Sequence, residues 1–276
     1  MATQNNIYKG NLNKVLKTVR GSIKKAIFYL GANIPYDYSL LLVTPLATNI
    51  NKIKKNYPDL YYLIELDYQI RDVDDILDEK LYKKNPLPIV EIKKQINNFK
   101  NVNKDFNTIA RLFELELKLH TNRENDLRNK IREIIEIRPC DYFLLIDKII
   151  EWFGSSLSAK DLYNSKLFFK EFQRLRDLLD DIMTAEEDPI KNSYNNIVIA
   201  EKNGIDYKFI DNIINNKFNN LNNYICKIKE HPHKRLLKHT IEFWGKQYLI
   251  LFKPLLVNYY INKEEYKKIY FMFKQV

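Results

Sequence analysis

Residues 159–188 read AKDLYNSKLFFKEFQRLRDLLDDIMTAEED, an amphipathic stretch that passes into a cluster of acids. Its helical periodicity predicts one helix that continues to about residue 187, where Pro189 stops it. Asp180, Thr184 and Asp188 are spaced at i, i+4 and i+8, so on a continuous helix their side chains would lie along one face. Carboxylates at this spacing repel each other unless a cation lies between them. The stretch therefore predicts a helix with a cation site near its carboxyl-terminal end.

A second acidic stretch, residues 74–79 with the sequence DDILDE, lies near the end of a predicted helix over residues 58–82. Asp74 and Asp78 share one face, which becomes largely apolar towards Leu63. Two such helices facing each other would form an apolar pocket with carboxylates at its mouth. Oxygen ligands of this kind suit Mg²⁺ together with substrate phosphate oxygens, so the pocket would suit a lipid diphosphate. The alternative is that both stretches are solvated helix faces.

The rest of the chain predicts an all-α protein. Its 276 residues are 45% hydrophobic and include only 6 Gly and 9 Pro, which favours long helices over many strands. No strand alternation, internal repeat or interdomain linker is evident. We expect one continuous domain over residues 1–276, in which residues 1–57 form a helical segment that packs on or caps the main helical domain, residues 58–276. The predicted helices include 104–121, 124–137, 159–187, 195–202, 206–230, 234–260 and 263–274.

Composition and charge argue against several classes of protein. Cys140 and Cys226 give neither a disulfide framework nor a metal site, which favours a reducing compartment. The chain has no apolar run of 18 residues and its N-terminus has no signal-peptide pattern, so we expect no transmembrane segment and a cytoplasmic location. The net charge is +10, but the lysines are spread along the chain without a nucleic-acid-binding signature, and no nucleic-acid partner is expected.

The two acidic stretches resemble the metal motifs of class I terpene synthases, a family of the isoprenoid synthase superfamily. Residues 74–78, DDILD, match the motif DDxxD. Residues 180–188, DDIMTAEED, are similar to the second motif, (N/D)Dxx(S/T)xxxE, with Asp188 in place of the final Glu. Residues 138–142, RPCDY, resemble the RxxD segment that senses the diphosphate in this family. The family's C-terminal Arg-Tyr pair has no counterpart, since no Arg follows Arg235.

The resemblance implies a fold, metal ions and roles for individual residues. The fold would be a single-domain helical bundle around an apolar cavity, with three Mg²⁺ ions or Mn²⁺ as a substitute. Arg138 would bind the diphosphate, Asp141 would be the linker residue of this segment, and Tyr142 would occupy the effector position. The implied metal ligands are Asp74, Asp75, Asp78, Asp180, Thr184 and Asp188. The candidate substrate-binding residues are Asp67, Ile70, Trp152, Phe168, Phe172, Arg176, Asp181 and Trp244.

The implied reaction is the Mg²⁺-dependent ionisation of a linear prenyl diphosphate and cyclisation of the resulting allylic cation, with release of diphosphate. The apolar approach on the first acidic helix, from Leu63 to Ile70, spans about two turns or roughly 10 Å. That depth suits a folded C15 chain, so farnesyl diphosphate is the expected substrate. The product would be a cyclic sesquiterpene hydrocarbon or alcohol. The chain itself is expected to be a monomer or a homodimer.

Two alternatives remain open. Residues 71–79, RDVDDILDE, are also similar to the RxxDDIVDE motif of phytoene and squalene synthases. Arg176 and Asp177, together with Asp181, are similar to the second motif of these head-to-head prenyl transferases, RDxxxD. The other alternative is a non-catalytic helical binding protein, which would suit the basic charge but would leave the paired acidic helices unexplained.

Overall fold

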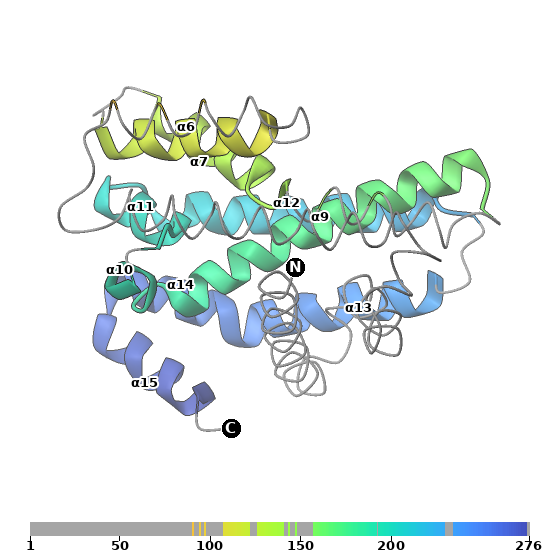
Figure 1. The fold of residues 1–276 in the computed structure, drawn as a ribbon. Helices are drawn as coiled ribbons and strands as arrows, with labels where there is room; N and C mark the ends of the chain where they lie inside the picture. The colour runs from red at the N-terminus through yellow and green to blue at the C-terminus, as the bar shows by residue number, and fades with distance from the viewer. Residues whose placement is uncertain are drawn as a thin grey trace, which may run out of the picture.

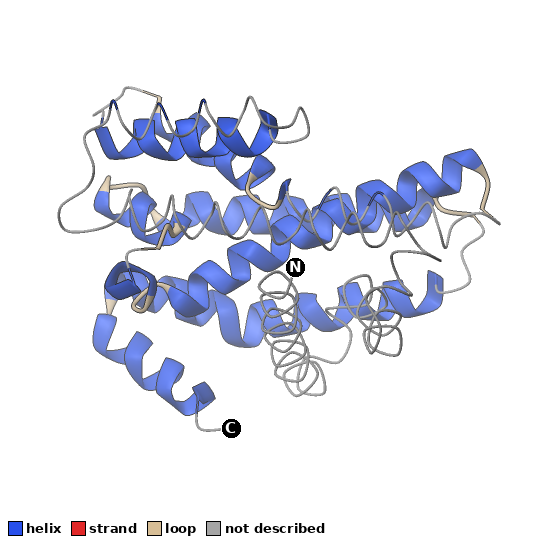
Figure 2. Cartoon of the chain, viewed as in Figure 1, coloured by secondary structure: helices blue, strands red, loops and turns tan. Residues whose placement is uncertain are grey.

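The computed structural model describes residues 107–121, 126–140, 157–191, 193–229 and 234–274, together with positions 90, 94, 97, 143 and 147. These ranges are helical between short turns and contain no strand (Figure 2). The prediction of an all-α protein is therefore confirmed for the described residues. The predicted N-terminal segment, residues 1–57, and its boundary with the main domain lie outside them.

The helices are named as in Figure 1, and η2 is a short π-helix. Their bounds are α6 (Asn107–Thr121), α7 (Leu127–Ile137), α9 (Ala159–Thr184), α10 (Asp188–Lys191), α11 (Asn196–Lys202), α12 (Tyr207–Lys227), α13 (Lys234–Gln247), η2 (Tyr248–Phe252), α14 (Lys253–Ile261) and α15 (Lys263–Lys274). The predicted helix over 234–260 is divided in the structure, and the one predicted over 159–187 ends at Thr184. Within the described ranges, no helix has the length and low polarity that crossing a membrane requires.

Helix α9 is the longest of the described helices and packs against α12, which runs beside it (Figure 1). Ser158 caps its start, because the Ser158 hydroxyl accepts a hydrogen bond from the backbone N–H of Asp161 at 3.1 Å. Leu175, Leu178 and Leu179 recur at helical spacing and are all buried. The apolar face that the sequence predicts on this helix therefore lies in the protein core.

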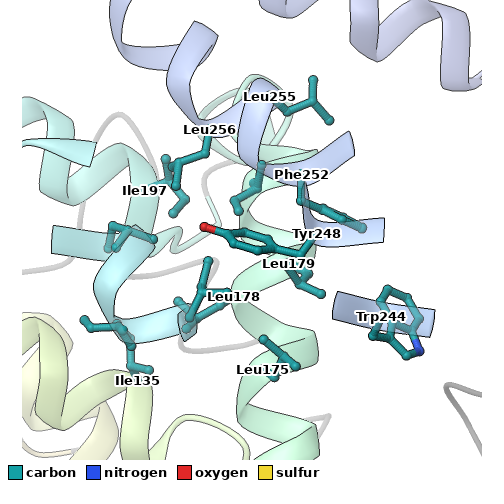
Figure 3. Close-up of a cluster of buried hydrophobic side chains, with 14 of the residues drawn as sticks. Ile135, Leu175, Leu178, Leu179, Ile197, Trp244, Tyr248, Phe252, Leu255 and Leu256 are labelled. Carbon is teal, nitrogen blue, oxygen red and sulfur yellow. The ribbon is translucent and has the colours of Figure 1, made fainter. Parts of the chain in front are cut away.

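The core is built around that face of α9 by residues from distant parts of the chain. Figure 3 shows the three leucines against side chains from α7, α11 and the C-terminal helices. Burial of this apolar surface is the main favourable term that holds these helices together. The labelled partners are Ile135, Ile197, Trp244, Tyr248, Phe252, Leu255 and Leu256.

A π-helical turn interrupts the single helix that was predicted over residues 234–260. Pro254 has no N–H to donate and its ring crowds the preceding turn, so a regular α-helix cannot pass through it unchanged. The wider turn η2 lies just before this proline. Tyr248 and Phe252, at its two ends, both point into the core, and the Tyr248 hydroxyl donates a hydrogen bond to Asp211 of α12.

A buried charge network ties α7, α9 and α12 together. Glu171 and Lys217 are both almost completely buried, with the Lys217 ammonium 3.4 Å from the Glu171 carboxylate. Lys217 also pairs with Glu136, and Arg174 lies 3.1 Å from Glu171 and 3.0 Å from Glu136. The Asn220 amide donates to the second oxygen of Glu171 at 2.7 Å. Both buried charges are thus paired and hydrogen-bonded, which offsets their desolvation.

Lys217→Met should lower the free energy of unfolding by about 2 kcal/mol or more, because it removes a charge partner from the buried Glu171 carboxylate. Urea unfolding followed by circular dichroism measures this loss. Lys268→Met is the matched control, since Lys268 pairs with Glu265 on the surface and its loss should cost no more than about 0.5 kcal/mol. Equal effects of the two substitutions would contradict the importance of the buried network.

Candidate functional site

The acidic stretch lies at the carboxyl-terminal end of α9, and the helix ends earlier than the sequence predicts. The last helical residue is Thr184, residues 185–187 form a turn, and Asp188 begins α10. The turn is closed by a hydrogen bond of 2.8 Å from the Glu187 N–H to the Thr184 carbonyl. The prediction that three side chains lie along one continuous helix is therefore wrong. Asp180 and Thr184 share a helical turn, whereas Asp188 reaches Thr184 through the turn that follows the helix.

This turn nevertheless brings Asp188 against Thr184. The Thr184 hydroxyl lies 2.5 Å from Oδ2 of Asp188 and 2.9 Å from the carbonyl of Asp180, and its single proton serves one acceptor at a time. Oδ2 of Asp188 also accepts a hydrogen bond of 2.9 Å from the Asn195 amide. Asp180 is exposed one turn before Thr184. The three residues of the predicted second metal motif thus lie at one end of α9.

Side chains from distant parts of the chain form hydrogen bonds with the backbone carbonyl groups in the last turn of α9. Carbonyl groups in the last turn of a helix lack the usual N–H partners. The Tyr266 hydroxyl, which comes from α15 and is fully buried, lies 2.8 Å from the carbonyl oxygen of Ile182 and 3.2 Å from that of Met183, so its single proton can be donated to either. The Asn195 amide donates to the carbonyl of Asp181 at 2.8 Å. The position of the helix end is therefore determined by α11 and α15.

Arg138 and Asp181 form an ion pair beside this helix end. Asp181 is buried, and its carboxylate accepts hydrogen bonds from Nη1 of Arg138 at 2.8 and 3.1 Å. It also accepts from the Asn196 backbone N–H at 3.1 Å and the Asn196 amide at 2.7 Å. Nη2 of Arg138 donates to the carbonyl of Tyr194 at 3.0 Å, and the guanidinium lies 5.1 Å from the Tyr194 ring centre. Arg138 is therefore held in one orientation.

Burial and neighbouring charges together determine the ionisation of this cluster. Burial on its own would lower the pKa of Arg138, but Asp181, Glu116 and Asp177 together raise it well above its ordinary value, so the guanidinium stays charged. Burial raises the pKa of Asp177 from 3.8 to about 7, against the opposing effect of Arg138 and Arg176. Asp177 therefore titrates near neutral pH, one helical turn before Asp181.

Three of the aromatic side chains that were predicted to contact substrate, Phe168, Phe172 and Trp244, lie in the core. Phe168 and Phe172 are stacked with ring centres 6.3 Å apart, and Trp244 meets Phe172 edge-on at 6.4 Å. All three are buried, and Trp244 also lies 6.1 Å from Phe252. These contacts make the cluster part of the packed core. Contact of these rings with a substrate stays a prediction.

Arg176 lies one turn before Asp180 and is partly exposed. Its Nη1 is 3.4 Å from the Gln173 side-chain oxygen, and the Gln173 amide donates to Asp177 at 3.0 Å. Gln173 therefore connects Arg176 to Asp177 along α9. The role of Arg176 in substrate binding also stays a prediction.

Several predicted site residues lie outside the described residues, so the facing arrangement of the two acidic helices stays a prediction. They are Asp67, Ile70, Asp74, Asp75, Asp78, Asp141, Tyr142 and Trp152.

The structure adds polar residues that the sequence did not single out. The Asn195 amide contacts Asp188, the Asn196 amide contacts Asp181, and the Tyr266 hydroxyl caps the helix end. An Asn before a predicted helix is a recognised capping signal, so Asn195 had a local signature as the start of α11. Its contact with Asp188 had none. Tyr266 carried no signal at all, because its partners are more than eighty residues away.

Comparison with protein-family models, curated proteins and solved structures gave no match. The chemistry of the site therefore has to follow from the residues at the end of α9 and their neighbours.

Asp177→Asn should remove one source of pH-dependent stability. The pKa of Asp177 in the folded protein is raised to about 7 from 3.8, so the unfolded chain ionises first as the pH rises. Its stabilising contribution is complete below about pH 4 and is lost as the pH rises through 7. The midpoint of urea unfolding, measured from about pH 5 to pH 8, should therefore shift increasingly in favour of the Asn variant.

Asn223→Ser, at an exposed position of α12, is the control, because it removes no titratable group and should leave the pH dependence of the wild type unchanged. If Asp177→Asn and the wild type differ by the same amount at every pH, Asp177 does not titrate in this range.

Proposed function

We propose that the chain is a Mg²⁺-dependent class I terpene synthase that ionises a linear prenyl diphosphate and cyclises the allylic cation. The observation that carries this proposal is the hydrogen bond of 2.5 Å between Thr184 and Asp188, one turn beyond the exposed Asp180. These side chains are the ones that the second metal motif would use. Thr184 and Asp188 are in contact even though the helix ends between them, which supports a shared role.

The donor set fits Mg²⁺. Asp180 and Asp188 offer carboxylate oxygens and Thr184 a hydroxyl oxygen, all of which are hard ligands. Among the described residues, no group of three or more His, Cys, Asp or Glu side chains is arranged for a metal. Two carboxylates and a hydroxyl are nevertheless sufficient for Mg²⁺, since its other positions are commonly taken by water and substrate phosphate oxygens. Asp74, Asp75 and Asp78 would supply the facing ligands.

Arg138 would bind the diphosphate directly. Its side chain is 26% exposed, and its hydrogen bonds to Asp181 and the Tyr194 carbonyl involve Nη1 and Nη2. A guanidinium has five N–H donors, so further donors remain for phosphate oxygens. Because Asp181 holds the group in place, little side-chain entropy would be lost on binding.

Each of these residues would have a distinct role in the reaction. Asp180, Thr184 and Asp188 would hold the ion, and Arg138 would hold the diphosphate at the same end of α9. Bound Mg²⁺ would stabilise the negative charge on the departing diphosphate. The apolar part of the site would exclude water from the cation, and the depth expected from residues 63–70 favours farnesyl diphosphate. The expected product is a cyclic sesquiterpene hydrocarbon or alcohol.

The head-to-head prenyl transferase is the less favoured alternative. Its second motif would use Asp177 and Asp181 as metal ligands. Asp181 is buried and already accepts hydrogen bonds from Arg138 and Asn196, which argues against direct metal binding by this carboxylate. A non-catalytic helical binding protein is the other alternative. A cytoplasmic location and a monomeric or homodimeric state remain predictions.

The decisive experiment is incubation of the purified protein with geranyl, farnesyl and geranylgeranyl diphosphates in MgCl₂. Diphosphate release and gas chromatography of the extract would be measured together. We expect release that depends on Mg²⁺ or Mn²⁺, with farnesyl diphosphate giving a cyclic C15 product. Squalene- or phytoene-sized products would favour the head-to-head alternative. No diphosphate release from any of the three substrates would favour the binding protein.

Asp180→Asn should reduce turnover of farnesyl diphosphate by about 100-fold or more, because it removes a charged metal ligand. Glu186→Gln is the matched control, since Glu186 lies in the same acidic stretch but outside the predicted ligand set. Circular dichroism should show both variants folded. Equal turnover by Asp180→Asn and the control would show that Asp180 is not a metal ligand.

A further inference from the structure

Asn195 is the residue that joins the start of α11 to the end of α9. It is only 2% exposed. Its side-chain oxygen accepts hydrogen bonds from the backbone N–H groups of Ile197 and Val198 at 2.9 and 3.1 Å, which makes it the N-cap of α11. Because the oxygen faces two N–H donors, the amide nitrogen must point the other way, and the orientation of the amide is determined.

The amide nitrogen points at the candidate metal site. It donates to Oδ2 of Asp188 at 2.9 Å and to the carbonyl of Asp181 at 2.8 Å, and it lies 3.4 Å from the Thr184 hydroxyl. An amide has two N–H groups, so Asp188 and the Asp181 carbonyl take one each. A helix cap requires only the oxygen of this side chain. The nitrogen contacts are therefore a second function of the residue.

The contacts constrain the carboxylate of Asp188. In the described part of the chain, the side-chain hydrogen bonds to this carboxylate come from Thr184 and Asn195, and both go to Oδ2. Two donors on one oxygen fix the rotation of the carboxylate and direct Oδ1 away from them. Groups that hydrogen-bond to a metal ligand in this way orient it, and their loss commonly weakens metal binding.

We propose that Asn195 is a positioning residue that orients Asp188 and Thr184 for Mg²⁺, an inference that rests on the function proposed above. The neighbouring Asn196 holds Asp181 and, through it, Arg138. The residues at the start of α11 therefore position both the proposed ion-binding residues and the proposed diphosphate-binding residue. Mutation of Asn195 should affect the ion-binding residues first.

Asn195→Ser tests this role, because Ser is also a favourable N-cap but is too short to reach Asp188. Inorganic pyrophosphate would be titrated into the full chain by calorimetry at increasing concentrations of MgCl₂. The variant should need about 10- to 100-fold more MgCl₂ than the wild type for half-maximal pyrophosphate binding. Asn203→Ser is the matched control, since Asn203 donates to the Ile199 carbonyl on the exposed end of the same helix.

Asn195→Thr provides a second variant that can also cap the helix but is too short to donate to Asp188. At the same MgCl₂ concentration, MgCl₂ with pyrophosphate should therefore raise its unfolding temperature less than that of the wild type. This readout applies even if Asn195→Ser does not fold. An unchanged dependence on MgCl₂ in the variants that fold would overturn the proposal for Asn195.

Pyrophosphate binding by the wild type distinguishes a failure of this inference from a failure of the proposed function. If the wild type and Asn203→Ser bind no pyrophosphate at any MgCl₂ concentration, the metal site and the inference built on it are both overturned. If the wild type binds pyrophosphate with Mg²⁺ and Asn195→Ser has the same MgCl₂ requirement, only the role of Asn195 is overturned.

Discussion

The last turn of α9 depends on hydrogen bonds from residues that are distant in sequence. Carbonyl groups at a helix end require partners, and here Tyr266 and Asn195 provide them to Ile182, Met183 and Asp181. The helix therefore ends where α11 and α15 meet it, and the chain turns back. This turn places the carboxylate of Asp188 against Thr184, so the candidate site forms only when these helices have packed together.

The same helix end separates two adjacent carboxylates into different environments. Asp180 and Asp181 are about 100° apart around α9, so they face different surroundings. Asp181 is buried and paired with Arg138 and Asn196, whereas Asp180 is exposed. A sequence of two neighbouring acids is compatible with either of two metal motifs. The structure distinguishes the two carboxylates, because the burial of Asp181 is offset by its ion pair with Arg138.

Periodicity was sufficient to predict the helices but not their ends. The apolar positions of α9, such as Leu175 and Leu179, follow a local pattern and were recognisable from the sequence. The end at Thr184 was predicted about three residues late, because Pro189 is a local signal while the partners of the last turn are not. Unlike Pro189, Pro254 does not end the helical run. The chain remains helical on both sides of it, with the π-helical turn η2 just before it. Contacts such as Tyr266 with Ile182 are tertiary and have no local signature.

The end of α7 is fixed to α9 at two points, and this determines where Arg138 lies. Arg174 donates to the Glu136 carbonyl at 2.8 Å, and two residues later Arg138 pairs with Asp181. The first contact belongs to the buried network around Glu171, and the second belongs to the candidate site. A guanidinium attached to a frame of this kind is oriented before any ligand binds, which is the condition under which an Arg recognises phosphate oxygens with little loss of entropy. The charge network in the core therefore helps to hold Arg138 in place, because the network and the ion pair of Arg138 with Asp181 join the same two helices.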